Sequence, residues 1–384
     1  MTEHRLSRWI LVAAACVAVF AATGQASAAQ ARRGVFGTLA NGKRIDSVEL
    51  TSASGIRVRI ITLGARIQSI YTPDRKGKLG DIVLGFSNPQ DYVKYGNYFG
   101  ASVGRYANRI DHGRFTLDGH AYHLSINDDG NSLHGGKKGF DKRIWTIDSV
   151  HNGKSASAVL SYISPNGQEG YPGTLHVTAT FTLFDSGELR IQYRATTNKP
   201  TVVNISSHSY FNLSPGDPAH FSVSHDILQI NASRYTPMNA TEIPTGQIAP
   251  VTGTPFDFLK PTRIGLRIHD GSDPQIVYGR GYDMNFVLNG PSGTMRFAAR
   301  LEDPRSGRVL SIYTTAPGLQ FYSGNFLNGT IVGRGGIAYR QGDAAVFEPQ
   351  DFPDAPNHPN FPSATLNPGQ VYHNTIVYRF SVSR

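Results

Sequence analysis

The chain has 384 residues, and its 37 Lys and Arg against 28 Asp and Glu give a formal net charge of +9. Hydrophobic residues make up 39% of it and charged residues 17%, which excludes a disordered polyelectrolyte and predicts a globular protein. The basic residues are dispersed, with their densest group at Lys137-Lys138 and Lys142-Arg143. Because nucleic-acid binding uses a concentrated basic stripe or a recognisable module, we expect no nucleic-acid partner.

The N-terminal segment differs in composition from the rest of the chain. Arg5 and Arg8 precede an uninterrupted apolar run from Trp9 to Ala22, and Ala26-Ser27-Ala28 supplies the small residues of a cleavage site. The run is shorter than the roughly 20 apolar residues of a membrane-spanning helix, so an uncleaved anchor is the less favoured alternative. We predict a cleaved secretory signal over residues 1–29, followed by a single domain over residues 30–384.

Several properties of the mature chain follow from this boundary. Its net charge falls to +8, because Glu3, Arg5 and Arg8 are removed, and it contains no cysteine, because Cys16 is the only one. Disulfides and cysteine metal sites are therefore excluded. We expect a protein exported to the periplasm or the extracellular medium, without stable membrane association, and by default a monomer.

Short segments in which every second residue is apolar predict β-strands throughout the chain. Asp118-Gly119 and Asp185-Ser186-Gly187 are turn sequences that divide two pairs of these segments into hairpins. In chain order the predicted strands cover residues 56–60, 81–84, 115–117, 121–124, 175–183, 189–195, 346–348 and 376–382.

The frequency of turn residues decides the fold class. Glycine and proline together number 41 + 22 = 63, and no segment has helical periodicity long enough to predict a helix. Many short antiparallel strands in a chain of this length indicate an all-β protein, built as one large antiparallel β-sandwich. The proline-rich segment 349–368 follows a strand directly, and we expect it to form a rigid wall beside a site.

Polar residues interrupt the alternation in a few segments, where they are candidates for chemistry. Each segment alone is weak support, because a lone histidine or carboxylate is more often structural than catalytic. The segments are Gly104-Arg105-Tyr106-Ala107-Asn108-Arg109-Ile110, Asn131-Ser132-Leu133-His134-Gly135-Gly136, Asn204-Ile205-Ser206-Ser207-His208-Ser209-Tyr210-Phe211-Asn212-Leu213, Gly281-Tyr282-Asp283-Met284-Asn285-Phe286, Pro317-Gly318-Leu319-Gln320-Phe321-Tyr322-Ser323-Gly324-Asn325, and the late carboxylate Glu348.

In this order the segments closely resemble the motifs of the aldose 1-epimerase (galactose mutarotase) family, from about Gly37 to the C-terminus. The resemblance implies a galactose mutarotase-like β-sandwich that uses neither a metal ion nor an organic cofactor. It implies that His208 is a general acid and Glu348 a general base. The matched sugar-contacting positions are Asn108, Arg109, His134, Tyr210, Asp283 and Gln320.

Two positions depart from the family pattern. Met284 follows Asp283 where the family usually has His, and Ser207 precedes His208 where it usually has Asn. Neither position performs proton transfer, so the implied reaction class is unaffected. The departures leave the orientation of Asp283 and His208 open.

The implied reaction interconverts the α and β anomers of a free aldohexose such as glucose or galactose. A base takes the proton of the C1 hydroxyl, an acid protonates the ring oxygen, and the ring opens and closes again on the other face. We expect His208 and Glu348 to contact one pyranose from opposite sides, and the activity to have a bell-shaped pH dependence.

Three other functions remain open on the sequence. His134, His208 and a carboxylate could hold the metal ion of a hydrolase. Asp283 and Glu348 could be the carboxylate pair of a glycoside hydrolase. The same contacting residues could also serve a carbohydrate-binding protein without catalysis.

Overall fold

A computed structural model describes residues 28–217 and 220–383, so residues 1–27 of the predicted signal, with Cys16, lie outside the described part. Here most strands belong to antiparallel sheets of nine, six and five strands. The nine-stranded sheet has the order β11 (Thr146–His151), β12 (Ser155–Ser164), β13 (Leu175–Phe184), β14 (Glu188–Thr197), β30 (Tyr372–Val382), β24 (Arg308–Thr314), β23 (Arg296–Glu302), β18 (Ile227–Ile230) and β21 (Thr262–Arg263). The five-stranded sheet consists of β1 (Gln30–Thr38), β2 (Arg44–Thr51), β3 (Arg57–Ile61), β4 (Arg66–Pro73) and β5 (Leu79–Asp81). The six-stranded sheet has the order β17 (Tyr210–Phe211), β28 (Ala345–Gln350), β25 (Gly318–Tyr322), β22 (Asp283–Val287), β19 (Arg234–Tyr235) and β20 (Ala249–Pro250).

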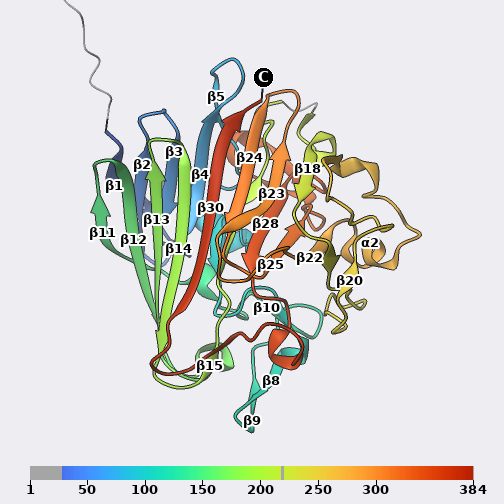
Figure 1. The fold of residues 1–384 in the computed structure, drawn as a ribbon. Helices are drawn as coiled ribbons and strands as arrows, with labels where there is room; N and C mark the ends of the chain where they lie inside the picture. Colours follow the sequence, from blue (N-terminus) through green and yellow to red (C-terminus); the bar gives the residue numbers. More distant parts are fainter. Residues whose placement is uncertain (1–27, 218–219, 384) are drawn as a thin grey trace, which may run out of the picture.

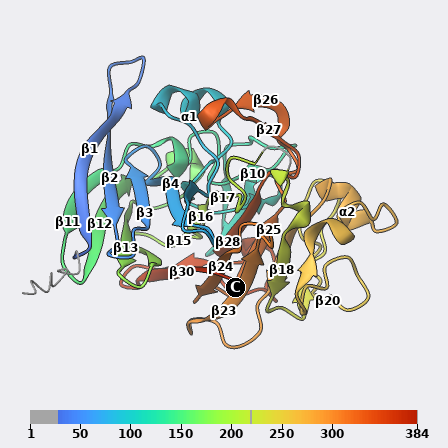
Figure 2. The ribbon, with the colours of Figure 1, turned by 90° about the horizontal axis from the view of Figure 1, so that it is seen from above.

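The nine-stranded sheet forms one layer, and the other two large sheets pack against it (Figures 1 and 2). A single hydrophobic cluster contains Val48 of β2, Phe181 of β13 and Phe347 of β28, all nearly inaccessible to solvent. Between the six-stranded and the nine-stranded sheet, the rings of Phe211 and Tyr378 pack edge to face, with centroids 5.2 Å apart. The predicted large antiparallel β-sandwich is therefore confirmed.

Shorter strands pair outside these sheets and bring loops of the chain into place. They are β7 (Arg109–Ile110) with β10 (Ser132–Leu133), β6 (Ala101–Val103) with β16 (Ser206–His208), β8 (Arg114–Leu117) with β9 (His120–His123), β15 (Thr201–Val202) with β29 (Thr365–Leu366), and β26 (Asn328–Val332) with β27 (Ala338–Arg340). The β6–β16 and β7–β10 pairs hold His208 and Arg109, and Asn108 and His134 directly flank the second pair, so these short strands help to build the site.

Both predicted hairpins are present. The strands β13 and β14 pair from Leu175↔Thr197 to Leu183↔Leu189 around the turn at Gly187, where φ is +82°. In the β8–β9 hairpin, Asp118 and Gly119 have φ values of +50° and +76°, the left-handed pair that a tight primed turn requires.

Two expectations were wrong in detail. The strand expected over residues 81–84 ends at Asp81, and Val83 makes only an isolated bridge to Phe211, because the chain there passes from one sheet to another. The segment 349–368 forms no wall of the cleft described below. It instead supports the β7 strand from behind, where the Asp354 N–H donates to the carbonyl of Arg109 at 2.8 Å.

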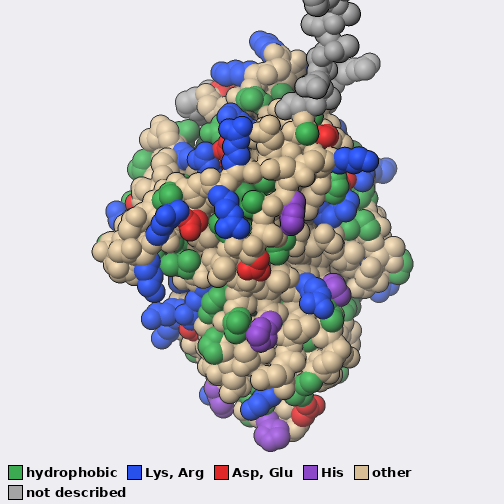
Figure 3. Space-filling view, turned by 90° about the vertical axis from the view of Figure 1, so that its left-hand side faces the viewer, with side chains coloured by type: hydrophobic (Ala, Val, Ile, Leu, Met, Phe, Trp, Pro, Cys, Tyr) green, Lys and Arg blue, Asp and Glu red, His purple; other side chains and the backbone are tan. Residues whose placement is uncertain are grey.

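The helices of the described residues are short. α1 covers Pro89–Tyr95 and α2 covers Pro274–Gly279, and each begins with proline after a side-chain cap, Asn88 or Asp273. Among the described residues no helix has the length and apolar character needed to cross a membrane. On the face shown in Figure 3, Lys and Arg side chains are scattered, with Asp and Glu side chains among them.

Candidate active site

Strand alternation in the six-stranded sheet separates a polar face from the core. Asp283 pairs with Tyr322, and Gln320 pairs with Glu348 across the next two strands. Since successive side chains of a strand point to opposite faces, these four side chains share one face. The opposite face presents Phe286, Phe321 and Phe347, all 0% exposed, to the hydrophobic core.

A cavity of about 330 Å³ opens over this polar face. Its size is in the range of small-ligand sites, which hold a few polar groups in fixed positions. The residues that line it are Tyr95, Gly96, Asn97, Tyr98, Asn108, Arg109, Asn127, Asp128, Asp129, Leu133, His134, His208, Tyr210, Glu242, Asp283, Tyr322, Phe326 and Glu348. Seven of the eight residues predicted from the sequence are among them, and we call this cavity the cleft.

His208 and Glu348 lie side by side in the cleft. Nε2 of His208 is 3.7 Å from Oε1 of Glu348, and the two side chains are 5% and 2% exposed. A pyranose ring does not fit between atoms this close, so the expectation that the pair faces a sugar from opposite sides is wrong. Both groups instead approach a ligand from the same side. This arrangement suits two oxygens bonded to one carbon, such as the hydroxyl and ring oxygens at C1 of a sugar.

Burial sets the protonation of this pair. It lowers the pKa of His208 to about 3 and raises the pKa of Glu348 well above its usual value, with Asp283 adding to the rise and Arg109 opposing it. Both shifts favour the uncharged form of each group. The favoured form of the pair is therefore a neutral His208 beside a protonated Glu348, and two such close groups titrate together.

His134 is fixed beside the pair by the backbone of Asn108, the residue before β7. Its N–H donates to the carbonyl of Asn108 at 3.1 Å, and the N–H of Asn108 donates to Nδ1 of His134, also at 3.1 Å. Nδ1 is therefore an acceptor, which leaves the proton of the neutral ring on Nε2. Asn108 and His134 both have positive φ, +65° and +49°. Left-handed backbone at non-glycine residues is typical of functional sites.

Arg109 is held by carboxylates on two sides. Its Nε donates to Oδ2 of Asp128 at 2.8 Å, and its Nη2 forms an ion pair with Oε2 of Glu242. Asp283 contributes to the same cluster and accepts a hydrogen bond from Nε2 of Gln320 at 2.6 Å. Gln320 thus orients Asp283 and does not itself line the cleft.

Aromatic side chains complete the walls. The ring of Tyr98 lies 4.6 Å from that of His134, and the ring of Tyr210 lies 5.1 Å from that of His208. These rings restrict the two imidazoles and exclude water from one side of the site. Tyr322 also lines the cleft, with its ring edge to face against that of Tyr210 and the centroids 6.1 Å apart.

Sequence reasoning missed Tyr98, Asp128, Glu242 and Tyr322. Asp128 lies three residues before a predicted motif and Tyr322 lies inside one, so both could have been suspected. Glu242 lies in the loop between Tyr235 and Ala249, a polar segment with no periodicity, and it gives no sequence signal.

Comparison with known proteins identifies the family. A model of the aldose 1-epimerase family matches residues 46–379. The chain is 45% identical to the galactose mutarotase of Homo sapiens over 356 residues, covering 92% of this chain and all of that protein. The chain belongs to the aldose 1-epimerase family.

Further members of the family match most of this chain in sequence or in structure. The aldose 1-epimerase of Escherichia coli K12 is 37% identical over 333 residues, which are 86% of this chain and 94% of that one. The solved structure of an aldose epimerase homologue from C. elegans superposes with a TM-score of 0.80 at 30% identity, covering 88% and 99% of the two chains. A galactose 1-epimerase from Lactobacillus acidophilus superposes equally well, with a TM-score of 0.80 at 29% identity over 92% and 99%.

The two departures from the aldose 1-epimerase pattern point away from the cleft. Met284 lies between Asp283 and Asn285 on the strand, 1% exposed, and packs in the core with Phe321 opposite it. The hydroxyl of Ser207 lies beside the phenol groups of Tyr193 and Tyr378, on the side of β16 away from His208. Each departure therefore alters core packing and leaves the polar face intact.

The spacing of His134, His208 and Glu348 bears on metal binding. One potential ligand atom from each lies within 4.8 Å of the others. Nδ1 of His134, which faces Glu348 at 3.9 Å, already accepts the N–H of Asn108. A metal ion on that side of the ring would have to displace this hydrogen bond, so the donor set fits a metal poorly.

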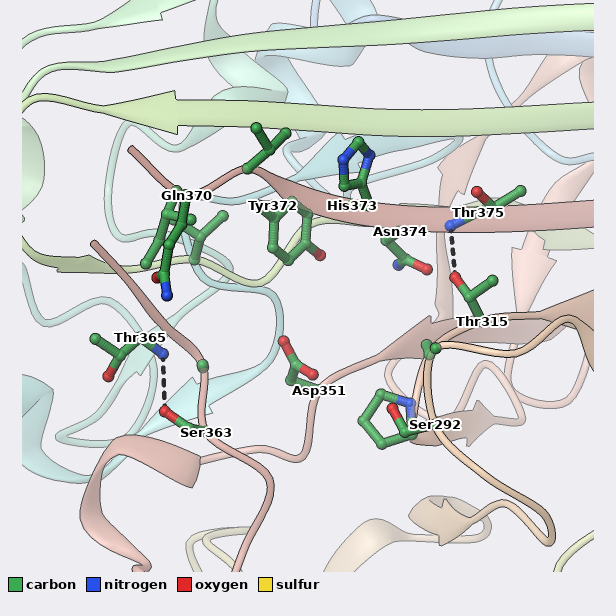
Figure 4. Close-up of a pocket in the computed structure, with 17 residues that line it drawn as sticks. Ser292, Thr315, Asp351, Ser363, Thr365, Gln370, Tyr372, His373, Asn374 and Thr375 are labelled. Carbon is green, nitrogen blue, oxygen red and sulfur yellow. Dashed lines mark hydrogen bonds between the residues drawn. The ribbon is translucent and has the colours of Figure 1, made fainter. Parts of the chain in front are cut away.

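A larger cavity, of about 660 Å³, lies away from these residues. It opens between the start of β30, which carries Tyr372 and Asn374, and the loop containing Thr315, with Asp351 between them (Figure 4). None of the eight predicted site residues lines it, and it contains no histidine paired with a carboxylate. Of these two cavities, the smaller cleft is therefore the one that holds a histidine paired with a carboxylate.

Proposed function

We propose that this protein is an aldose 1-epimerase, an isomerase that interconverts the anomers of free aldohexoses such as glucose and galactose. The observation that carries the proposal is the 3.7 Å separation of His208 Nε2 and Glu348 Oε1, two buried side chains that line the cleft. Family membership over most of the chain and the named mutarotases among its relatives support the same reaction.

The proposed reaction uses the pair as base and acid. Glu348 takes the proton of the C1 hydroxyl, the bond from C1 to the ring oxygen breaks, and His208 gives its proton to that ring oxygen. The open-chain aldehyde rotates about C1–C2. On closure the ring oxygen attacks C1 and returns its proton to His208, while Glu348 returns its proton to the former carbonyl oxygen.

His208 and Glu348 share one proton, so they can act as acid and base while the pair as a whole stays uncharged. A neutral His208 with a protonated Glu348 and a protonated His208 with an ionised Glu348 differ only in the position of one proton. Burial favours the first form in the resting protein. A hydrogen-bonding sugar replaces the missing solvation and thereby lowers the cost of the second, reactive form.

The remaining residues would hold the sugar. The Nε2–H of His134 can donate to a hydroxyl or to the developing negative charge on O1, and Asp283 can accept from hydroxyls. Asn108 and Tyr210 extend this set along the cleft. Buried polar groups left without partners are costly, so such a site discriminates against sugars that lack the matching hydroxyls.

The direct test is polarimetry. Freshly dissolved α-D-glucose or α-D-galactose should relax to anomeric equilibrium faster with the protein than in buffer alone. Sugar binding without acceleration would indicate a carbohydrate-binding protein instead. Release of reducing sugar from a glycoside would favour a glycoside hydrolase.

A metal-dependent enzyme is the second candidate, because His134, His208 and Glu348 converge. Measuring mutarotation after exhaustive chelation distinguishes the two functions. Acid–base catalysis by the side chains alone predicts unchanged mutarotation after chelation, whereas loss of activity that added zinc restores would establish the metal-dependent alternative.

We further propose that the protein is exported after cleavage near residue 29 and acts as a monomer. The charged, apolar and small-residue sequence of the leader supports export, and one chain supplies a full set of acid, base and polar contacts in the cleft, which supports the monomer. N-terminal sequencing of protein from the periplasm or medium tests the first point, and an intact Met1 would contradict it. Light scattering of the purified protein tests the second.

A further inference from the structure

The cleft is acidic although the chain as a whole is basic. Its lining includes five acidic side chains, two histidines and one arginine, Arg109, and no lysine. Lys142, whose ammonium group lies 5.7 Å from the ring centroid of Tyr98, does not line the cleft. The five acidic residues are Asp128, Asp129, Glu242, Asp283 and Glu348.

Glu242 enters this cluster through an unusual loop. Its φ is +60°, a conformation that non-glycine residues rarely adopt. Asn239 holds the loop in place: its Oδ1 accepts from the N–H groups of Thr241 and Ile243 at 2.9 and 3.1 Å, and its carbonyl accepts from the N–H of Glu242 at 2.9 Å. The result is a loop carboxylate with a side chain only 9% exposed, turned toward the cleft.

Glu242 forms an ion pair with the guanidinium of Arg109. A free arginine in a sugar site would attract carboxylate or phosphate groups, because its fork of N–H donors matches those anions. Here Asp128 occupies Nε and Glu242 occupies Nη2. The only arginine of the cleft lining is thus paired with carboxylates on two sides before any ligand arrives.

We propose that Glu242 is a specificity-determining residue that makes the cleft select neutral sugars and reject anionic ones, such as uronates. This inference rests on the proposed function, whose site it refines. Like charges placed together in a partly closed site cost free energy, and built-in repulsion of the wrong ligand is a general means of discrimination. Glu242 would act by repelling the anion and by occupying the cation that would otherwise bind it.

The charge state of Glu242 fixes the conditions of the test. Burial raises its pKa to about 8, with Asp283 adding to the rise and Arg109 opposing it. The groups that face it are Arg109, Asp128, Asp129 and Asp283. The charge of Glu242 is therefore partial near neutral pH and nearly complete at about pH 9, so the repulsion should grow between these pH values and is measured at about pH 9.

The experiment compares D-glucose with D-glucuronate, which differ by a carboxylate in place of the C6 hydroxymethyl group. For wild type we expect kcat/KM to be lower for glucuronate. The isosteric variant Glu242→Gln should raise the glucuronate-to-glucose ratio of kcat/KM by about three- to tenfold, the effect of one unit charge removed a few ångströms away in a partly exposed site. A merely structural defect would lower both values together and leave the ratio unchanged.

Two further variants complete the test. Asp128→Asn removes the other carboxylate from Arg109 and should move the ratio in the same direction. Glu188→Gln is the matched control, because Glu188 also pairs with arginines, Arg190 and Arg379, but on β14 outside the cleft. It should leave the ratio unchanged.

The outcomes distinguish this inference from the proposed function. If wild type accelerates glucose mutarotation but both cleft variants keep the wild-type ratio, the role of Glu242 is refuted alone. If wild type fails to accelerate mutarotation, the proposed function is refuted, and calorimetric binding of the same two sugars still measures the discrimination. Equal wild-type preference for glucose and glucuronate in that measurement would overturn the inference.

Discussion

Replacing Glu348 with Gln separates the catalytic role of this residue from its effect on stability. The variant keeps the size of the side chain and removes its capacity to accept a proton. A positioned general base contributes about 10²- to 10⁴-fold, so kcat for glucose mutarotation should fall by that factor, or about 2.7–5.5 kcal/mol in activation free energy. Polarimetry at saturating sugar gives kcat directly.

The same substitution should not destabilise the protein. Burial raises the pKa of Glu348 in the folded state above its unfolded value, so its stabilising contribution is complete below the unfolded pKa and is lost as the pH rises through the folded one. The Gln variant has no such loss. Its unfolding temperature relative to wild type should therefore increase as the pH is raised from acidic to alkaline.

Two results would contradict this reasoning. Activity within tenfold of wild type, in a variant with native circular dichroism, would remove Glu348 from the role of base. An unfolding temperature below that of wild type at every pH would show that the carboxylate stabilises the fold, against the direction expected for a buried group without a hydrogen-bond partner on Oε2.

The remaining predictions concern the partner of Glu348, the pH profile and the core. His208→Asn should also lower kcat by about 10²- to 10⁴-fold, and the double variant should be little worse than either single one, since the pair acts as a unit; additive losses would contradict a shared step. The pH profile of kcat/KM should be flat through the neutral range and fall toward pH about 3. The reason is that the lowered pKa of His208 and the raised pKa of Glu348 widen the pH range in which the pair shares one proton. A fall in kcat/KM near pH 6.5, the ordinary pKa of histidine, would refute this prediction. Met284→His should lower the free energy of unfolding in urea by about 1–3 kcal/mol, by burying an unpaired polar ring, and should leave kcat within about threefold of wild type; a large loss of kcat at native stability would show that Met284 contacts the site after all.

The shifted pKa values of His208 and Glu348 predict a broader pH plateau than the bell-shaped dependence expected from the sequence. That expectation assumed side chains with near-normal pKa values. The residues of the pair could be named from their motifs, but their desolvation is produced by strands and aromatic rings that lie far away in the sequence, such as Tyr98 and Tyr322, whose ring centroids lie 5.8 and 6.5 Å from that of His208.

The local pattern of residues predicted the fold well for a physical reason. Alternation along a strand records directly which side chains are buried, and turns such as Asp118-Gly119 require backbone conformations that few residues adopt. The prediction was wrong at residues 81–84, where the apolar run continues and stays buried but the chain leaves its sheet, and hydrogen-bonding partners from elsewhere decide the structure.

The sequence by itself determined the strand-rich architecture, the family resemblance and which residues are candidates for chemistry, because these depend on residue type and short-range order. Tertiary structure alone decided that His208 and Glu348 lie side by side, that Met284 and Ser207 face the core, and that Glu242 reaches Arg109 from a loop without any sequence signal. Distances between segments far apart in the chain, and the burial that shifts their pKa values, arise only when the sheets pack together. They are properties of the assembled sandwich.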